Sequence, residues 1–550
     1  MKSKKELLFL ALGGSGEIGM NVNLYACDGK WLMVDLGMTF ADPFYPGVDL
    51  VFADLEFIEE RTDDLLGIVL THAHEDHIGA VPYFAQELGV PLYATPFTAR
   101  LVAEKLEEAG LLDEVELNVI PNEGAFSLGP FDIRYIPLAH SIAEGNALLI
   151  DTPHGRIFHT GDWKLDDEPR IGEPATEEEL IEIGEDGVLA LVCDSTNVFN
   201  PKPSGSEGEV RAGLLDTVSG LSGRRVVVTT FASNVARLRT LGEVAQATGR
   251  QLCVAGRSLD RIIRVAQASG YLKDFPETIG MDEAMDLPRG EVMVLATGGQ
   301  GEARAALARI AGDQHPIRLE AGDAVVFSSR QIPGNELAIG RIQNALVAKG
   351  VMLVTDRQSM IHVSGHPGRP ELVALYEWLQ PEMLVPVHGE MRHMTEQARL
   401  GREEGIARTI VQKNGDLVRL APDGPEKIDE VRAGRLVLDG DIIGPADGEA
   451  MAARRKLAFQ GLVTVALAVS PAGKLVSQVE VAPIGLPLED DMAAFLAEAR
   501  EDVAQALRDL KGDRKKDRLA VAEAARLAAR RAAQRWSGKK PVVQVLLCEE

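Results

Sequence analysis

Short apolar runs rich in β-branched residues alternate with longer amphipathic stretches along most of the chain, a pattern typical of strands alternating with helices. In the first 200 residues the runs predict strands over 7–12, 23–26, 30–34, 67–70, 91–94, 131–137, 146–150, 156–159 and 188–192. Amphipathic stretches predict helices over 81–88 and 96–109. The turn sequences Asp28-Gly29 and Pro153-His154-Gly155 lie between pairs of these strands and indicate hairpins. We therefore expect sheets covered by helices in this part of the chain.

From residue 205 the pattern becomes a regular alternation of one strand and one helix. Ser206 and Glu209 have the spacing of a capping box at the start of the first helix. Strands are predicted over 226–231, 252–255, 292–296, 324–328 and 351–354, and further helices begin near residues 234, 258, 302 and 335. This alternation predicts a parallel sheet wrapped by helices, inserted into the first domain.

The pattern changes again past residue 445. Two strands over 462–467 and 475–481 flank the turn Pro471-Ala472-Gly473, and a long helical stretch and a strand over 542–547 follow. These elements predict a small α+β terminal domain. The expected organisation is a first domain over 1–203 and 355–445, an inserted domain over 204–354, a linker over 446–461 and a terminal domain over 462–550.

The chain is acidic, with a formal net charge of −26 and a pI near 4.9. This argues against a generally basic nucleic-acid coat but leaves room for a local positive channel. Residues 511–540 contain 11 Lys and Arg against 3 Asp and Glu, a stretch that either contacts RNA or is a solvated basic helix. The four cysteines form no CxxC pair, so we expect reduced thiols and neither disulfides nor zinc ligands. The apolar run near residues 7–12 is too short for a signal peptide with a cleavage site, and no run reaches membrane-spanning length. We therefore expect a cytoplasmic protein without membrane contact.

The densest candidate chemistry follows the apolar strand 67–70, where His72, His74, Asp76 and His77 lie within six positions. Neutral imidazoles and a carboxylate suit zinc or a similar divalent ion. Residues two apart in an extended loop point the same way, so His72 and His74 can share one metal, while Asp76 and His77 can serve a second. An upstream GxGxxG pattern at residues 14–19 lacks the helix that dinucleotide binding requires, so we expect a glycine loop near the metal edge.

The His-x-His-x-Asp-His run resembles that of the metallo-β-lactamase superfamily. Later motifs, together with the inserted domain, resemble those of the β-CASP nucleases of that superfamily, and specifically those of the bacterial ribonuclease J family. These motifs are Cys-Asp-Ser-Thr-Asn at 193–197, His-Val-Ser-Gly-His at 362–366 and Pro-Val-His-Gly-Glu at 386–390. Small departures are Ala139 before His140, where the family often has serine, and Trp163, where phenylalanine is common.

The resemblance implies an αββα sandwich with an inserted β-CASP α/β domain and two divalent ions per subunit, most often Zn²⁺, with Mn²⁺ or Mg²⁺ as alternatives. The implied ligands of the first ion are His72, His74, His140 and Asp162, and those of the second are Asp76, His77, Asp162 and His388. Asp35 would orient a metal-binding histidine, and His362, held protonated by Asp194, would be the general acid. The implied site for a terminal 5′-phosphate comprises Ser233, Ser364, Gly365 and His366, next to helix N-termini that favour anions.

The activity implied by the resemblance is hydrolysis of single-stranded RNA, as a 5′-to-3′ exonuclease preferring 5′-monophosphate ends and as an endonuclease, in rRNA maturation and mRNA decay. A homodimer or homotetramer, with RNA-degradation or ribosome-associated partner proteins, is implied as well. The alternatives are a DNA nuclease, a small-molecule hydrolase of the same superfamily and a non-catalytic RNA-binding scaffold. The inserted domain, Asp194 and His362 argue against the hydrolase, because ester hydrolysis needs none of them.

Overall fold

The structure is a computed structural model that describes residues 5–331 and 335–549. The chain forms two compact units, one of Met1–Thr39 with Phe52–Gly434 and the other of Phe40–Val51 with Arg435–Glu550. In the described part, no helix has both the length and the apolar character that a membrane crossing requires.

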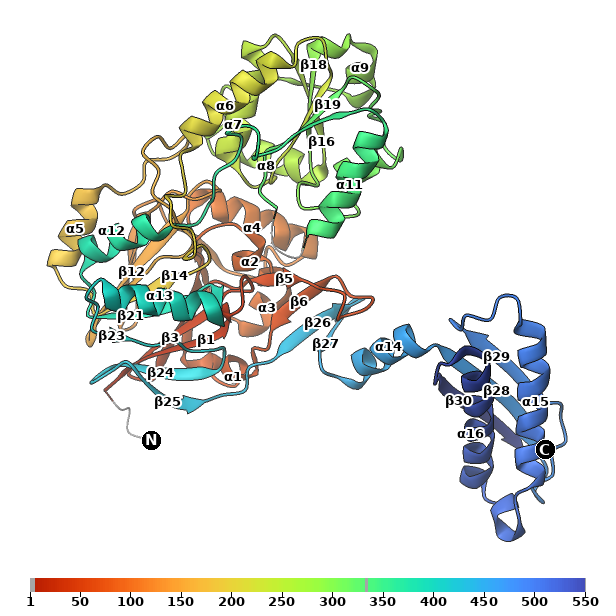
Figure 1. Ribbon diagram of the computed structural model, residues 1–550. Helices are drawn as coiled ribbons and strands as arrows, with labels where there is room; N and C mark the ends of the chain where they lie inside the picture. Colours follow the sequence, from red (N-terminus) through yellow and green to blue (C-terminus); the bar gives the residue numbers. More distant parts are fainter. Residues whose placement is uncertain (1–4, 332–334, 550) are drawn as a thin grey trace. The chain divides into compact units, whose positions relative to one another are not determined.

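Two sheets packed face to face form the base of the first unit (Figure 1). The eight-stranded sheet has the order β25 (Glu426–Glu430), β24 (Asp416–Ala421), β1 (Leu7–Gly13), β3 (Val22–Cys27), β4 (Lys30–Val34), β7 (Leu65–Val69), β8 (Leu92–Ala94), β9 (Leu117–Val119). The seven-stranded sheet has the order β10 (Ala125–Leu128), β11 (Phe131–Pro137), β12 (Asn146–Thr152), β13 (Gly155–His159), β14 (Ala190–Asp194), β21 (Met383–Val387), β23 (Arg408–Thr409). Phe9 and Tyr25 from one sheet share a buried core with Ile133 and Tyr135 from the other.

Helices cover the outer faces of both sheets. Leu180 of α5 (Glu177–Glu185) and Leu375 of α12 (Arg369–Leu379) share a second buried cluster with Leu149 and Leu191 of the seven-stranded sheet. Helix α13 (Met391–Glu403) contacts strand β21 beside them. On the other sheet, α4 (Pro96–Ala109) contacts β8 and β9 and packs against α3 (Val81–Leu88). The predicted αββα sandwich is therefore confirmed.

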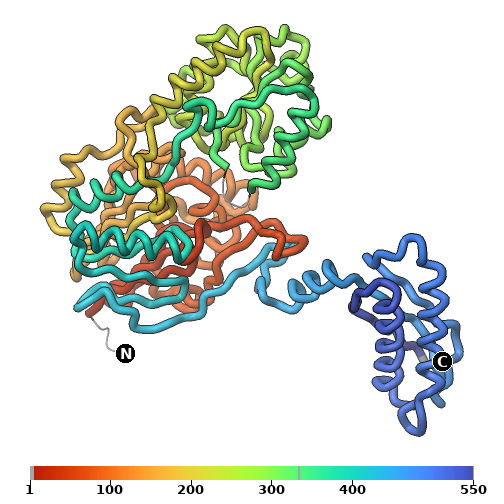
Figure 2. The backbone as a smooth tube through the Cα atoms, in the orientation of Figure 1, coloured from red at the N-terminus to blue at the C-terminus, as the bar shows by residue number. Residues whose placement is uncertain are grey.

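The inserted domain leaves the sandwich after β14 and returns before α12, as the tube of Figure 2 shows. Its six strands are all parallel, in the order β17 (Thr278–Ile279), β16 (Gln251–Ala255), β18 (Val292–Ala296), β15 (Val226–Thr229), β19 (Ala324–Phe327), β20 (Met352–Val354). The helices are α6 (Glu207–Gly220), α7 (Val235–Ala247), α8 (Arg257–Ala268), α9 (Met281–Asp286), α10 (Ala306–Ala311) and α11 (Glu336–Ala348). The predicted parallel sheet wrapped by helices is confirmed.

One predicted helix start in this domain is wrong. The helix expected from Glu302 begins at Ala306. Gly301 has a left-handed φ of 82°, and the Glu302 carboxylate accepts a hydrogen bond from the Gln300 amide, so these residues form a turn. The Thr297 hydroxyl accepts a bond from the Ala306 amide and satisfies a free donor at the helix start.

In the second unit, α15 (Met492–Arg508) and α16 (Arg518–Ser537) cover one face of a sheet ordered β29 (Glu480–Ile484), β28 (Leu462–Val469), β30 (Val542–Glu549). The predicted α+β terminal domain is confirmed. Its second strand lies at 480–484 and not at 475–481. Residues 470–474 form a turn in which Gly473 has a φ of 73°, and Leu475 makes only an isolated bridge to Val469. The segment 446–461 contains helix α14 (Glu449–Gln460).

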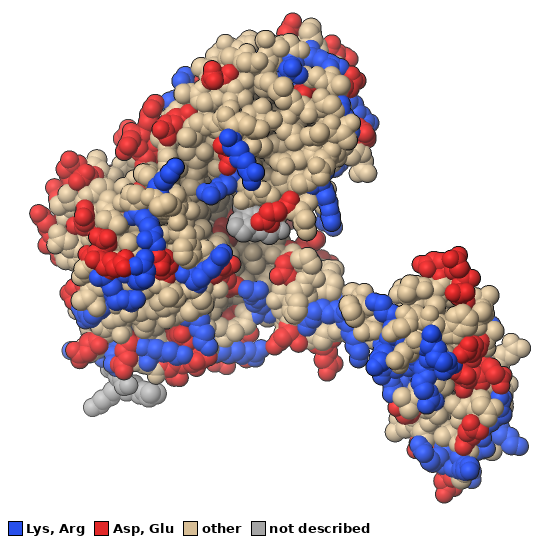
Figure 3. Space-filling view, in the orientation of Figure 1, with Lys and Arg blue, Asp and Glu red and all other residues tan. Residues whose placement is uncertain are grey.

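Basic side chains are numerous on the visible face of this second unit (Figure 3). Several of those between residues 511 and 540 are paired with acids. Arg535 binds Glu498, and Arg526 binds Glu523 one turn away on the same helix. These arginines therefore contribute to a mixed, solvated surface.

Candidate metal centre

The candidate ligands gather where several strands end at one edge of the sandwich. His72 and His74 follow β7, His140 follows β11, Asp162 follows β13 and His388 follows β21. The short helix α2 (Glu75–Ile78) carries Asp76 and His77. The fold thus brings together seven side chains that are spread over more than 300 positions of the chain.

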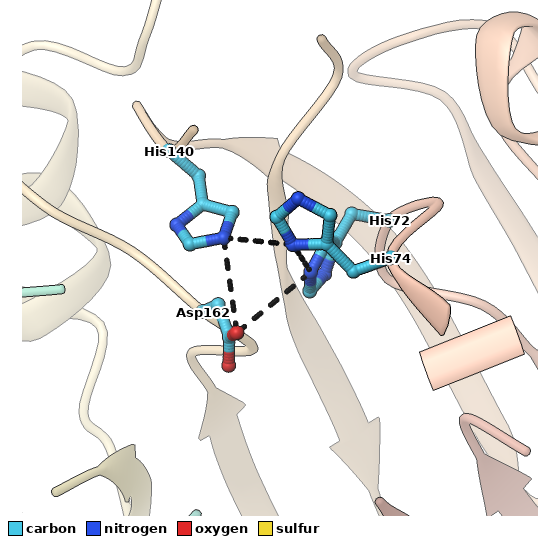
Figure 4. Close-up of side chains that lie close together, drawn as sticks. All are labelled: His72, His74, His140 and Asp162. Atoms are coloured by element: carbon cyan, nitrogen blue, oxygen red, sulfur yellow. Dashed lines mark hydrogen bonds and ion pairs between the residues drawn. The ribbon is translucent and has the colours of Figure 1, made fainter. Parts of the chain in front are cut away.

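The first group comprises His72, His74, His140 and Asp162, whose side chains converge in Figure 4. His74 Nδ1 lies 3.1 Å from Nε2 of both His72 and His140. Asp162 Oδ2 lies 3.8 Å from His72 Nε2 and 3.7 Å from His140 Nε2. Ligand atoms around a tetrahedral zinc, with bonds near 2.1 Å, are about 3.4 Å apart. The four atoms therefore match the spacing around one small cation.

The protonation of this group also suits a cation. Burial lowers the pKa of His72 and of His140 well below the ordinary value, and it lowers the pKa of His74 to about 4. All three imidazoles are therefore neutral at pH 7, which is the form that coordinates metal.

The second group comprises Asp76, His77, Asp162 and His388. His77 Nε2 lies 3.3 Å from Asp162 Oδ2, and His388 Nε2 lies 3.2 Å from Asp76 Oδ2 and 3.6 Å from Asp162 Oδ1. Burial opposes charge on both imidazoles, but the carboxylates, Asp162 first, outweigh it and raise the pKa of His77 and of His388. Without a metal ion, protons on His77 and His388 balance the charge of the carboxylates. Metal binding at this group would therefore release protons.

Asp162 belongs to both groups and provides the test of whether the residues fit a metal. Its Oδ1 atom is buried and makes no hydrogen bond to any described residue, and its ion pair with His388 Nε2 is 3.6 Å long. An ionised oxygen left in this state is costly unless a cation binds it. The donor set and the spacing therefore fit divalent metal at this edge of the sandwich.

Asp35 supports His77 from behind. Its carboxylate lies 2.7 Å from His77 Nδ1 and accepts bonds from the amide and hydroxyl of Thr71. Asp35 is fully buried and has a left-handed φ of 64°. The backbone passes close by at Gly37, where an added Cβ would lie 1.8 Å from the Asp76 carbonyl oxygen. Contacts of this kind fix the tautomer and orientation of a metal-binding imidazole.

We expect Asp35→Asn to weaken metal binding by about 10- to 100-fold, the usual effect of losing an outer-sphere carboxylate. Asparagine tolerates the left-handed backbone, so the loop should keep its shape. Competition with a chromophoric chelator measures the affinity. The matched control is Asp423→Asn, an exposed aspartate with a φ of 57°. Equal affinity in the two variants would contradict the assigned role.

The predicted contact between His362 and Asp194 is wrong. Asp194 Oδ2 lies 2.7 Å from Nδ1 of His366, four residues further on. Burial lowers the pKa of His366, but Asp194 and then Asp162 outweigh burial and raise it above the ordinary value. The imidazole whose protonated form Asp194 favours is therefore His366.

His362 lies in a different environment. Burial lowers its pKa well below the ordinary value, and the nearby charges of Arg237, Arg330 and Lys164 lower it further. Its Nδ1 is buried and has no hydrogen-bond partner among the described residues. A neutral imidazole of this kind is a poor proton donor but can bind a polar group of a ligand.

Buried Arg237 fixes the loop that carries both histidines. Its guanidinium donates to Glu207, to the carbonyl oxygen of Ser328 and to that of Ile361, immediately before His362. Arg237 and Ser328 belong to the inserted domain and Ile361 leads back to the sandwich. The hydrogen bonds of Arg237 therefore link the inserted domain to the loop that contains His362 and His366.

The residues expected to bind a terminal phosphate lie beside the first group. Ser233 Oγ is 3.0 Å from His74 Nε2. The carbonyl oxygen of Gly365 lies 2.6 Å from Nδ1 of His140, and the Ser364 hydroxyl accepts a bond from the His366 amide. An added Cβ at Gly365 would lie 3.1 Å from the His140 ring, so a larger residue would press on a ligand.

The helix N-terminus expected to attract phosphate after this loop is already occupied. The Glu371 carboxylate accepts bonds from the amides of Gly368 and Ser204. The start of α12 therefore carries its own anion, and this part of the prediction is wrong. A phosphate would be held by the loop itself.

Sequence reasoning gave no role to Thr196. Its hydroxyl lies 2.6 Å from His388 Nδ1 and contacts the His388 carbonyl oxygen. His388 has a left-handed φ of 50°, so this threonine holds a strained residue in place. Its position two residues after Asp194 at a strand end was the available signal.

Comparisons with known proteins agree along the whole chain. Residues 18–188 match the model of the metallo-β-lactamase superfamily, and residues 350–411 match that of the Zn-dependent metallo-hydrolase RNA specificity domain. The β-CASP domain of ribonuclease J matches residues 223–346, and its C-terminal domain matches residues 449–550.

Three similar curated proteins are each named ribonuclease J. That of Sinorhizobium meliloti is 42% identical, over 100% of this chain and 98% of its own. The Corynebacterium glutamicum protein is 35% identical over 98% and 75%, and the Thermus thermophilus protein is 36% identical over 83% and 82%. A solved protein of unknown function from Enterococcus faecalis V583 shares the fold, with a TM-score of 0.54 and 17% identity over 75% of this chain and all of that one.

Proposed function

The chain belongs to the ribonuclease J family, and from this premise we propose that it hydrolyses single-stranded RNA in a metal-dependent reaction, from the 5′ end of 5′-monophosphate RNA and also internally. The observation that carries the proposal is the pair of ligand groups that share Asp162, beside His366, whose Nδ1 lies 2.7 Å from Asp194 Oδ2. We propose two ions per subunit, zinc in preference to Mn²⁺ or Mg²⁺, because imidazoles outnumber carboxylates.

Divalent ions bound at the two groups would stabilise charge on a phosphoryl oxygen and lower the pKa of the attacking water. The chain's own residues do the rest. The leaving 3′-oxygen needs a proton, and in this proposal His366 donates it while Asp194, 2.7 Å from its Nδ1, stabilises the imidazolium. Asp35 holds His77, and Thr196 holds His388, so that neither imidazole turns away.

A terminal 5′-phosphate would lie against Ser233, Ser364 and Gly365, with the neutral ring of His362 beside the same loop. Hydroxyls and an unpartnered imidazole offer hydrogen bonds without bulk, and nearby Arg330 adds positive charge. A bulkier 5′-triphosphate would be excluded. The alternative of a DNA nuclease stays open to test, because no described contact identifies a 2′-hydroxyl.

We further propose rRNA maturation and mRNA decay in the cytoplasm as its setting, because the relatives are bacterial ribonucleases. A homodimer or homotetramer, with RNA-degradation or ribosome-associated partner proteins, belongs to the same proposal.

The test is digestion of one RNA sequence carrying a 5′-monophosphate, a 5′-triphosphate or a 5′-hydroxyl, beside matching single-stranded DNA. We expect processive release of nucleotides from the monophosphate RNA alone, and internal cuts in the other RNAs. Each lost charge-assisted hydrogen bond to phosphate should lower kcat/KM by about tenfold or more. Equal rates on all four substrates would rule out the 5′-phosphate site.

A further inference from the structure

A separate set of side chains that could bind a metal ion lies far from the candidate metal centre. Cys27, Asp28 and His154 each offer one ligand atom, and these atoms all lie within 4.8 Å of one another. Asn21, which bonds to Asp76, precedes strand β3, and Cys27 ends it six residues later. At about 3.3 Å per residue the set is roughly 20 Å from the candidate metal centre.

Two hairpin tips hold these ligands. Asp28 and Gly29 form the two-residue turn between β3 and β4, with left-handed φ values of 52° and 87°. His154 lies in the turn between β12 and β13, where the Thr152 hydroxyl accepts a bond from its amide. Short hairpin turns define the backbone closely, so the main chain that carries Asp28 and His154 is fixed without a ligand. His154 Nε2 lies 2.7 Å from Asp28 Oδ1.

We propose that Cys27, Asp28 and His154 form an accessory site for a divalent ion of zinc type, with water as the fourth ligand. Thiolate, imidazole and carboxylate are the three donors that zinc takes in proteins. Metal bonds of 2.0–2.3 Å place such donors about 3.3–3.8 Å apart, so only small side-chain shifts are required. The Cys27 side chain is buried, while those of Asp28 and His154 are 37% and 17% exposed and give access from solvent.

The ion would join the two sheets of the sandwich, because β3 and β4 belong to one sheet and β12 and β13 to the other. Its role is therefore stabilisation of the sandwich at the edge away from the metal centre. Burial and the neighbouring Asp28 raise the pKa of the Cys27 thiol to about 11, which argues against a nucleophilic or redox role. Sequence spacing gave no hint of the site, because 126 positions separate Asp28 from His154.

Cobalt(II) tests the proposal, because a thiolate bound to cobalt absorbs in the near ultraviolet and the ligands of the metal centre include no cysteine. We expect the chelator-stripped full-length protein to gain this absorption on titration with Co²⁺, and Cys27→Ser to lack it. The control Cys548→Ser, at an exposed cysteine, should keep it. His154→Gln should need at least about tenfold more Co²⁺, since loss of even an outer-sphere partner has that effect.

Zinc should also raise the thermal midpoint of the wild type more than that of His154→Gln. Near-ultraviolet absorption that is missing in the wild type, or that persists in Cys27→Ser, would overturn the proposal. If Cys27→Ser fails to fold, the test is the Co²⁺ titration of His154→Gln, whose substituted residue is partly exposed. A titration curve identical to that of the wild type would overturn the proposed site. RNA hydrolysis should be unchanged in His154→Gln, so this test is independent of the proposed function.

Discussion

Asp162→Ala is expected to lower RNA hydrolysis at least about a thousandfold, corresponding to about 4 kcal/mol of lost transition-state stabilisation. Asp162 is the one carboxylate common to both ligand groups, with Oδ2 facing His72, His77 and His140 and Oδ1 facing His388. Its removal takes one carboxylate from each position, which leaves only imidazoles at the first and Asp76 as the remaining carboxylate at the second. His77→Ala, which affects the second group only, should also abolish processive degradation.

The measurement is kcat/KM on 5′-monophosphate RNA, together with metal content after gel filtration. The control is Asp151→Ala, a half-exposed carboxylate on the neighbouring strand that pairs with Arg156. We expect the control to match the wild type in both measurements. Activity of Asp162→Ala within tenfold of the wild type would mean that the ligand groups are not the catalytic centre.

Most of the metal centre could be predicted because it depends on local patterns. His72, His74, Asp76 and His77 are neighbours in the chain. The other ligands, which the family resemblance implied, lie within three residues of the end of a strand. Strand ends at one edge of a sheet necessarily lie close together. The regular alternation over 226–354 predicted the parallel sheet for a similar reason, since the central strands β15, β18 and β19 are buried on both faces.

The predictions from the sequence were wrong where the local structure depends on tertiary packing. His362 and His366 lie in one irregular loop, and no periodicity indicates which ring faces Asp194. Which of the two rings faces Asp194 depends on Arg237. This residue of the inserted domain donates a hydrogen bond to the Ile361 carbonyl oxygen, next to His362. Strand β25 is fully exposed and polar, so it carries no hydrophobic pattern and forms only by pairing with β24.

His366→Ala should lower hydrolysis by about 10²- to 10⁴-fold, the usual contribution of a general acid, with metal content unchanged. His362→Ala should reduce the preference for 5′-monophosphate ends and leave internal cleavage closer to the wild type, because its neutral ring supplies no proton. A p-nitrophenolate leaving group needs no proton. On a substrate with this leaving group, His366→Ala should therefore lose less of the wild-type hydrolysis rate than on RNA. An equal deficit on both substrates would indicate that His366 acts only in binding.

The pH dependence separates proton donation from a structural role. Asp194, with Asp162, raises the pKa of His366 against the opposing effect of burial, so the acid stays protonated to higher pH. Activity should therefore fall as pH rises through this raised value. Asp194→Asn removes the main stabilising charge and should move the alkaline limb of the pH–rate profile to lower pH. Bound cations affect the wild type and Asp194→Asn alike. An alkaline limb at the same pH in these two proteins would therefore show that Asp194 does not control the proton on His366.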